Sequence, residues 1–120
     1  MRKLHHLLTA CALGAITLTG SALAADAAKE PTGKQLAFDR SKGNCLACHG
    51  MPTQPDAEAT GTYGPPLIAM SARYPDKAKL RAQIWNAMDF NPSTTMPPFG
   101  KHQVLTEQEI DKVVDFIYGL

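Results

Sequence analysis

Two cysteines and a histidine stand together near the middle of the chain. Cys45 and Cys48 have the spacing Cys-x-x-Cys, and His49 follows at once. Two thiols three residues apart can each add to a vinyl group of a haem, and the next residue then points its imidazole at the iron. The motif therefore predicts one haem c that is covalently attached through Cys45 and Cys48, with His49 as an axial ligand of the iron.

Two other kinds of site could use the same cysteines. A thioredoxin-like dithiol is typically preceded by a strand, whereas the polar run at residues 39–44 precedes Cys45. A structural zinc site needs four ligands, and His102 would have to join the three residues of the motif. Cys48 and His49 are adjacent, and adjacent residues rarely both reach one small tetrahedral ion. Haem attachment is favoured over both alternatives.

A six-coordinate haem needs a second axial ligand besides His49. Five side chains could supply it: Met51, Met70, Met88, Met96 and His102. Met51 lies two residues after His49 and cannot reach the opposite face of the haem. Met70 and Met88 lie in segments with helical spacing of apolar residues, which predicts that both pack in the core.

Met96 has a different setting from the other methionines. It lies in a proline-stiffened loop at residues 91–100, which can be neither a helix nor a central strand. A stiff loop far from His49 in sequence suits a distal ligand, because little entropy is lost in holding a weak iron–sulfur bond. We expect Met96 to be this ligand, with His102 as the alternative and a surface position as the simpler interpretation of His102. A His/Met-ligated iron has no open position for a substrate, which indicates an electron relay.

The first 24 residues have the pattern of a cleaved signal peptide. Arg2 and Lys3 form a positive start, an apolar stretch covers residues 7–18, and Ala22-Leu23-Ala24 is a small-x-small cleavage signal. We expect cleavage after Ala24 or one residue later, which leaves a single cytochrome domain at residues 25–120 in the periplasm.

Charge and hydropathy narrow the functional classes further. Cys11 ends a sequence that superficially resembles a lipoprotein site, but the apolar stretch before it is short and contains His5 and His6, so we do not expect lipidation. No long apolar segment follows the signal, so the mature protein is not expected to span a membrane. The formal net charge of +1 gives no electrostatic reason to expect nucleic acid as a partner.

Short helices are predicted to position the motif. One helix is expected from Gly33 to Asp39, and residues 51–63 are expected to form an irregular surface loop. A second helix should start around Tyr74-Pro75-Asp76, with Pro75 in its first turn. Its buried face is predicted to comprise Leu80, Ile84, Trp85 and Met88, and Trp85 could also lie at a haem edge or pack between helices.

The last helix has the clearest signature. Thr106 and Glu109 form a capping box, and apolar residues follow at helical spacing. The predicted buried residues are Ile110, Val113, Val114 and Ile117. A mature domain of under about 100 residues has a small core of its own, so the haem is expected to supply much of it.

Together these features resemble the class I cytochrome c family. The resemblance rests on the Cys-x-x-Cys-His motif, the run Gly64-Pro65-Pro66-Leu67, the Met-Pro loop and the final amphipathic helix. It implies an all-α fold in which three or more short helices surround one covalently bound haem c. It also implies that the Pro65 carbonyl accepts a hydrogen bond from the ring of His49, which fixes the ring orientation.

The order of several longer blocks is similar to the SoxX family, the monohaem subunits of SoxAX sulfur-oxidation cytochromes. The blocks are Gly43 to His49, Gly64 to Leu67, Arg73 to Asp76, Ile84 to Asn86 and Asn91 to Ile110. This resemblance implies a heterodimer with a SoxA-type haem subunit, which joins thiosulfate oxidatively to a cysteine of a SoxYZ-type carrier protein. The chain itself would take electrons from the SoxA-type haem and pass them to another cytochrome. A free-standing electron carrier and a haem-based sensor are the alternatives.

Overall fold

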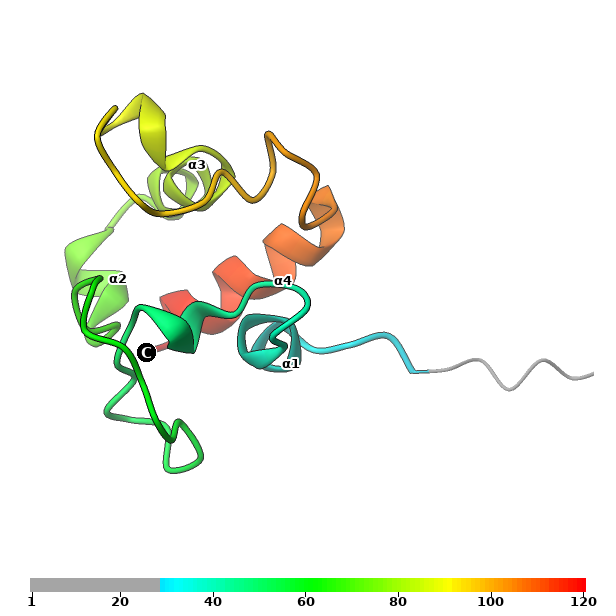
Figure 1. The fold of residues 1–120 in the computed structure, drawn as a ribbon, viewed down its shortest axis with the longest axis vertical. Coiled ribbons are helices and arrows are strands. Elements are labelled where there is room, and N and C mark those ends of the chain that lie inside the picture. The colour runs from blue at the N-terminus through cyan, green and yellow to red at the C-terminus, as the bar shows by residue number, and fades with distance from the viewer. Residues whose placement is uncertain (1–28) are drawn as a thin grey trace, which may run out of the picture.

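The computed structural model describes residues 29–120, and these residues fold into short helices arranged around one long C-terminal helix (Figure 1). The predicted all-helical class is confirmed, and no β-strand occurs in the described part of the chain. The elements in order are α1 (Gly33–Phe38), the 3-10 helix η1 (Cys45–Ala47), α2 (Met70–Arg73), α3 (Lys77–Trp85), the 3-10 helix η2 (Ala87–Asp89) and α4 (Glu107–Tyr118). The predicted signal peptide, residues 1–24, lies outside the described residues.

Helices α1 and α4 pack directly against each other, and α1 matches its predicted range to within one residue. The contact is closest at Gly33, where an added Cβ would lie 1.9 Å from the carbonyl oxygen of Lys112. Only a residue without a side chain permits this approach. At the other end of α1, the rings of Phe38 and Phe116 meet edge to face, with 6.1 Å between their centroids.

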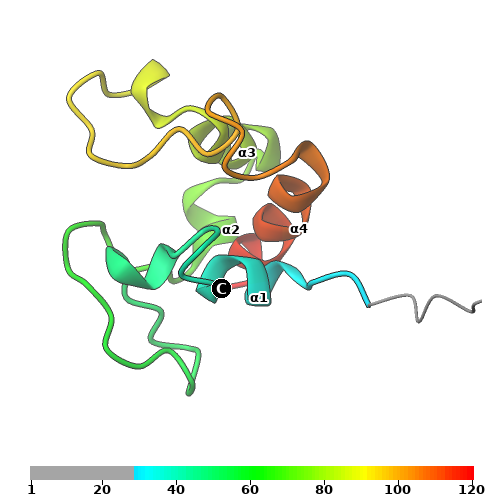
Figure 2. The ribbon, with the colours of Figure 1, turned by 45° about the vertical axis from the view of Figure 1, so that its right-hand side comes forward.

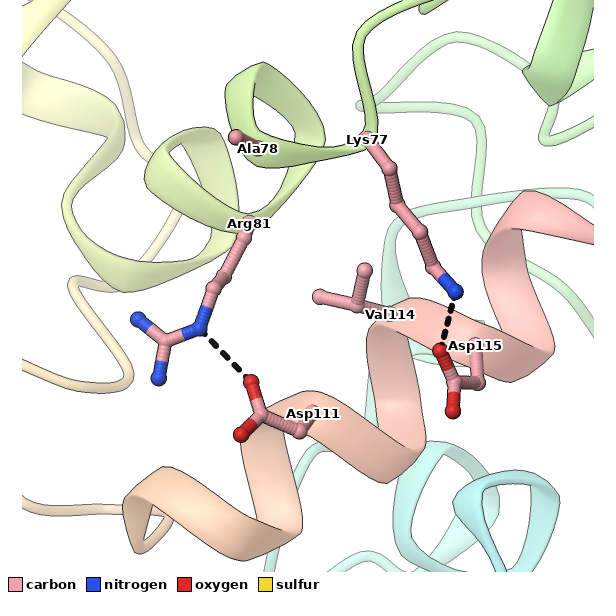
Figure 3. Close-up of a pocket in the computed structure, with 6 residues that line it drawn as sticks. All are labelled: Lys77, Ala78, Arg81, Asp111, Val114 and Asp115. Carbon is pink, nitrogen blue, oxygen red and sulfur yellow. Dashed lines mark hydrogen bonds and ion pairs between the residues drawn. The ribbon is translucent and has the colours of Figure 1, made fainter.

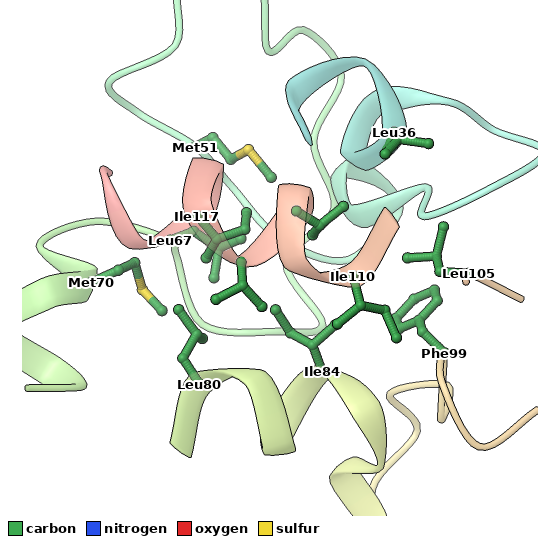
Figure 4. Packing of buried hydrophobic residues seen from close by; sticks show 12 residues of the cluster. Leu36, Met51, Leu67, Met70, Leu80, Ile84, Phe99, Leu105, Ile110 and Ile117 are labelled. Carbon is green, nitrogen blue, oxygen red and sulfur yellow. The ribbon is translucent and has the colours of Figure 1, made fainter. Parts of the chain in front are cut away.

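Helix α4 forms the centre of the core, as its sequence pattern predicts. The capping box is present in both directions, since Glu109 N–H donates to Thr106 Oγ1 and Thr106 N–H donates to Glu109 Oε2. All four predicted apolar residues of α4 are buried (Figure 4). Residues from α1, α2, α3 and the connecting loops surround them: Leu36, Met51, Leu67, Met70, Leu80, Ile84, Phe99 and Leu105.

Helix α3 corrects two predictions about the second helix. Asp76 caps its start by accepting a hydrogen bond from Ala78 N–H, so Pro75 precedes the helix and does not lie in its first turn. Leu80 is buried as predicted. Met88 is not, because its side chain is 45% exposed. The extended backbone at Asn86 ends the helix, so the helical period that would have turned Met88 inward does not continue.

Ion pairs join the exposed edges of α3 and α4 around a shallow pocket of about 280 Å³ (Figure 3). Arg81 Nε lies 2.6 Å from Asp111 Oδ1, and Lys77 pairs with Asp115 one turn away. Both pairs lie at the solvent-exposed surface, so each contributes little to stability. The pocket is a by-product of helix packing and contains none of the predicted site residues.

The connection between η1 and α2 contains no regular structure across residues 51–63, which confirms the predicted loop. Met51 at its start is nevertheless buried and joins the core. Among residues 29–120, no helix combines the length and the apolar character needed to cross a membrane.

Glu109 makes the stability of this fold depend on pH. Hydrogen bonding from Thr106 and from the Lys42 ammonium holds the pKa of Glu109 below its ordinary value of 4.5. A depressed carboxyl pKa stabilises the fold above the unfolded value, and this contribution is lost as the pH falls through the folded value. Glu109→Gln keeps the capping oxygen but cannot ionise. As the pH falls from about 6 to about 3, we expect this variant to lose less unfolding free energy than the wild type.

Urea unfolding at a series of pH values measures this effect. Glu58→Gln removes a carboxylate from the exposed 51–63 loop and is the control, for which we expect a profile parallel to that of the wild type. A Glu109→Gln profile that also ran parallel to the wild type would contradict the assignment.

Candidate haem site

One large cavity brings most of the predicted site residues together. It has a volume of about 750 Å³, and Cys45, Cys48, His49 and Met96 all line it. In Figure 2 the loop after η2 (yellow to orange) and the segment around η1 (teal to green) form opposite sides of this part of the molecule. The volume falls in the range of about 300–1,000 Å³ that is typical of cofactor and ligand pockets.

The cysteine motif is held by a short helical turn and by a neighbouring segment. Asn44 adopts a left-handed conformation, with φ of 47°, directly before η1, and His49 N–H donates to the carbonyl of Cys45 at 2.9 Å. Residues 61–67 then run alongside residues 46–50. Three backbone N–H···O bonds of 2.8 Å join the two segments, from Gly61 to Leu46, Gly64 to Cys48 and Leu67 to Gly50.

This pairing places Pro65 opposite the ring of His49. The carbonyl oxygen of Pro65 lies 2.7 Å from His49 Nδ1, which is hydrogen-bonding distance. The ring leaves no room for a side chain at Gly64, because a Cβ at that position would be 2.3 Å from His49 Cε1. The imidazole is thus held between a glycine without a side chain and a carbonyl acceptor.

Met96 reaches the cavity from the proline-rich loop. Local bonds shape this loop, from Ser93 N–H to Asn91 Oδ1 and from Met96 N–H to Thr94 Oγ1, each at 3.1 Å. Met96 is half-buried, and the side-chain amide of Gln83 on α3 lies 3.9 Å from its sulfur.

The other candidates for the distal ligand occupy different positions. Met70 is buried in the core, as predicted, but it also lines the cavity. Met51 is buried, and Met88 is exposed on η2; neither lines the cavity. His102 is exposed, as its surface interpretation predicted, and is absent from the cavity lining.

Among residues 29–120, the Lys, Arg, Asp and Glu side chains that line the cavity are all cationic. Arg40, Lys42 and Arg73 contribute to the lining, and no carboxylate of this part of the chain does. Lys42 is paired with Glu109 at 3.0 Å. A cationic rim around an apolar interior suits a flat apolar group with anionic substituents, such as the two propionates of a haem.

The environment of Cys45 argues against a redox dithiol. Burial, together with the nearby Cys48, raises the pKa of the Cys45 thiol to about 11. Reactive dithiols instead have a lowered thiol pKa, which keeps one sulfur ionised near neutral pH. The zinc alternative also lacks support, because no three His, Cys, Asp or Glu side chains within residues 29–120 are grouped closely enough to hold a metal ion.

Three residues of the site could not be identified from the sequence patterns. The sequence shows Gly64 and Arg73 only as the first residues of two blocks that resemble the SoxX family, and Gln83 carries no signal at all. Each depends on contacts between distant segments, which the spacing of residues cannot show. Trp85, considered as a haem-edge residue, does not line the cavity. Its ring lies against Gly100, where an added Cβ would be 2.1 Å from Trp85 Cε3, and its carbonyl accepts a hydrogen bond from Gly100 N–H at 3.1 Å.

Comparison with known proteins agrees with this site. The family profile described as "Cytochrome C oxidase, cbb3-type, subunit III" matches residues 28–117. A protein named "Uncharacterized lipoprotein" from Aquifex aeolicus (strain VF5) is 35% identical over 77 residues, or 64% of this chain. The chain spans 36% of the length of that relative.

A solved structure has the same fold. A chain of the "Crystal structure of SoxXA from P. pantotrophus" aligns with a TM-score of 0.65 at 30% sequence identity, and the match covers 72% of this chain and 77% of that one. The predicted cytochrome c fold is thereby confirmed. With its Cys-x-x-Cys-His motif in the cavity, the chain belongs to the cytochrome c family that the matching profile describes, and haem c is attached through Cys45 and Cys48.

Proposed function

We propose that this chain is the electron-transfer subunit of a SoxXA-type complex. The observation that carries the proposal is its likeness to the SoxXA structure, at 30% identity over most of both chains. The blocks that resemble the SoxX family extend this likeness from the haem motif to the Met96 loop and the start of α4. In this proposal the chain is exported to the periplasm through residues 1–24 and pairs there with a SoxA-type cytochrome.

Within the site, each residue has a defined task. Cys45 and Cys48 would hold the haem covalently, and His49 and Met96 would be the ligands of its iron. The Pro65 carbonyl accepts a hydrogen bond from His49 Nδ1–H, which fixes the imidazole ring and makes it a stronger ligand. A haem c held in this way supplies a one-electron couple between ferrous and ferric iron.

These ligands assign electron transfer to this chain and catalysis to its partner. Removal of the signal peptide removes Cys11, and attachment of the haem uses Cys45 and Cys48. The mature chain then has no free thiol. With Met96 as a ligand, the iron would have no open position for a substrate. The chain therefore accepts one electron at a time from the SoxA-type subunit and passes it to another cytochrome, while thiosulfate is joined to the cysteine of a SoxYZ-type carrier on the partner. Alone, it is not a catalyst.

Co-expression with a SoxA-type cytochrome tests the proposal. We expect the two chains to co-purify in equal amounts, and the pair to conjugate thiosulfate to a SoxYZ-type carrier. The isolated chain should show no such activity. Failure to form a complex, or activity of the isolated chain, would contradict the proposed role.

A free-standing carrier that serves a terminal oxidase is the second candidate. The matching profile is named for an oxidase subunit, which supports this alternative. It predicts a chain that stays monomeric beside the SoxA-type protein and reduces an oxidase directly. The same co-expression experiment, followed by an oxidase assay of the isolated chain, separates the two candidates.

A further inference from the structure

We propose that Arg73 is a positioning residue for His49 and acts through the Pro65-Pro66 turn. The Arg73 guanidinium donates from Nη1 to the carbonyl oxygen of Pro66 at 2.8 Å. The preceding carbonyl, that of Pro65, lies 2.7 Å from His49 Nδ1. Arg73 and His49 thus hold two successive carbonyls of one turn. The inference rests on the proposed role of His49 as an axial ligand.

The turn has few other means of being held in place. Neither Pro65 nor Pro66 has a backbone N–H group, so the turn can be fixed only through its carbonyls or by bonds on either side. The flanking bonds are those from Gly64 N–H to Cys48 and from Leu67 N–H to Gly50. The planar peptide unit between Pro66 and Leu67 is thus held on both sides, by the Leu67 N–H bond to Gly50 and by the Arg73 guanidinium at the Pro66 carbonyl. This double restraint limits rotation of the neighbouring Pro65 carbonyl away from the ring.

Arg73 is itself anchored firmly enough for this task. It is the last residue of the single-turn helix α2, whose first residue, Met70, is buried in the core. Before the helix, Ala69 N–H donates to the carbonyl of Leu120 at 2.7 Å, which ties α2 to the end of the chain. The same Nη1 atom of Arg73 lies 3.4 Å from Met70 Sδ. A guanidinium fixed in this way has a defined direction toward the turn.

The charge of Arg73 is not committed to an acidic partner. The residues described here place no carboxylate within ion-pair distance of it, although other basic residues on the next helix, Lys77 and Arg81, are both paired. Arg73 also lines the haem cavity, as Arg40 does. Removing Arg73 therefore changes both the restraint on the turn and the charge at the cavity, and a test must separate these two effects.

Arg40→Met provides the matched control, because it removes a cation that lines the same cavity and has no hydrogen bond to the proline turn. The measurement is proton NMR of the oxidised, haem-loaded protein, with two readouts. One is the exchange rate of the His49 Nδ1 proton with solvent, and the other is the position of the His49 ring resonances shifted by the iron. A residue that only supported folding would move neither.

We expect Arg73→Met to speed the exchange of the His49 Nδ1 proton several-fold and to shift the ring resonances. Arg73→Lys keeps the charge but lacks the planar fork, so its effect should be smaller and in the same direction. Arg40→Met should leave the exchange rate at the wild-type value.

Wild-type exchange in both Arg73 variants would overturn the proposal, and so would an equal change in Arg40→Met, since charge alone would then explain it. Should Arg73→Met fail to fold, wild-type exchange in Arg73→Lys decides against the proposal and faster exchange decides for it. The absence of iron-shifted His49 resonances in the wild type would refute the ligand role of His49 itself, and would be recognised before any variant is compared.

Discussion

Replacing Met96 with alanine should convert a closed haem into one that binds carbon monoxide readily in its ferrous form. The wild type should bind it poorly, because in the proposed site the thioether of Met96 would occupy the sixth position. The variant should also lose the methionine-ligand band of the oxidised protein, and its reduction potential should fall, since the soft thioether favours ferrous iron. Optical titration with carbon monoxide and a redox titration measure both effects.

Met70 is the rival that this experiment must exclude. Its side chain lines the same cavity, and its sulfur lies 3.4 Å from Arg73 Nη1. Met70 is 2% exposed and belongs to the core, whereas Met96 stands on a loop shaped by its own local hydrogen bonds. A ligand carried on such a loop can meet the iron without leaving a hole in the core.

Leucine substitutions separate the two methionines, because leucine keeps the side-chain volume and removes only the sulfur. Met96→Leu should abolish the methionine-ligand band, and Met70→Leu should keep it. Met88→Leu changes an exposed residue outside the cavity and should match the wild type. Loss of the band in Met70→Leu, with its retention in Met96→Leu, would reverse the assignment and return Met96 to a packing role.

Sequence patterns could predict the parts of this fold that depend on local chemistry. The capping box of Thr106 and Glu109 brings its own hydrogen bonds, and the apolar spacing of α4 defines a buried stripe without reference to the rest of the chain. The haem motif is equally local, since all its residues lie within one short segment. The Cys-x-x-Cys-His motif can therefore be recognised without knowledge of the fold.

Features that depend on distant segments could not be predicted. Met88 continues the apolar spacing of α3, but the extended backbone at Asn86 breaks the helix first. Nothing in the pattern around Met70 shows that α2 is a separate turn, held by the chain terminus through Ala69. Arg73 is a similar case. Basic residues follow it in sequence at Lys77, Lys79 and Arg81, a pattern typical of a solvated surface. Only the fold places the Arg73 guanidinium next to the carbonyl of Pro66.

Gly64 is the position where one added methyl group would collide with the ring of His49. Its φ angle is not in the left-handed region, so its requirement comes from space and not from backbone conformation. A Cβ at Gly64 would lie 2.3, 2.5 and 2.8 Å from three atoms of the His49 ring. Carbon atoms pack at about 3.5–4.0 Å, so either the ring or the turn must move by more than an ordinary adjustment.

We expect Gly64→Ala to destabilise the haem-loaded protein by at least about 1–3 kcal/mol, the usual cost of overpacking. Because the displaced ring belongs to His49, the proposed iron ligand, the protein should also retain less haem c and show an altered spectrum. Guanidinium unfolding gives the stability, and the haem content per chain gives the second quantity.

Gly50→Ala is the matched control in the same pair of segments. A Cβ at Gly50 would meet only Thr60 Oγ1, at 3.8 Å, which is ordinary contact. Its effect on the unfolding free energy should stay within about 1 kcal/mol, because alanine also reduces the entropy of the unfolded chain. Equal stability and haem content in the two variants would mean that the His49 ring has room to move, and that the turn at Pro65 does not hold the ring in place.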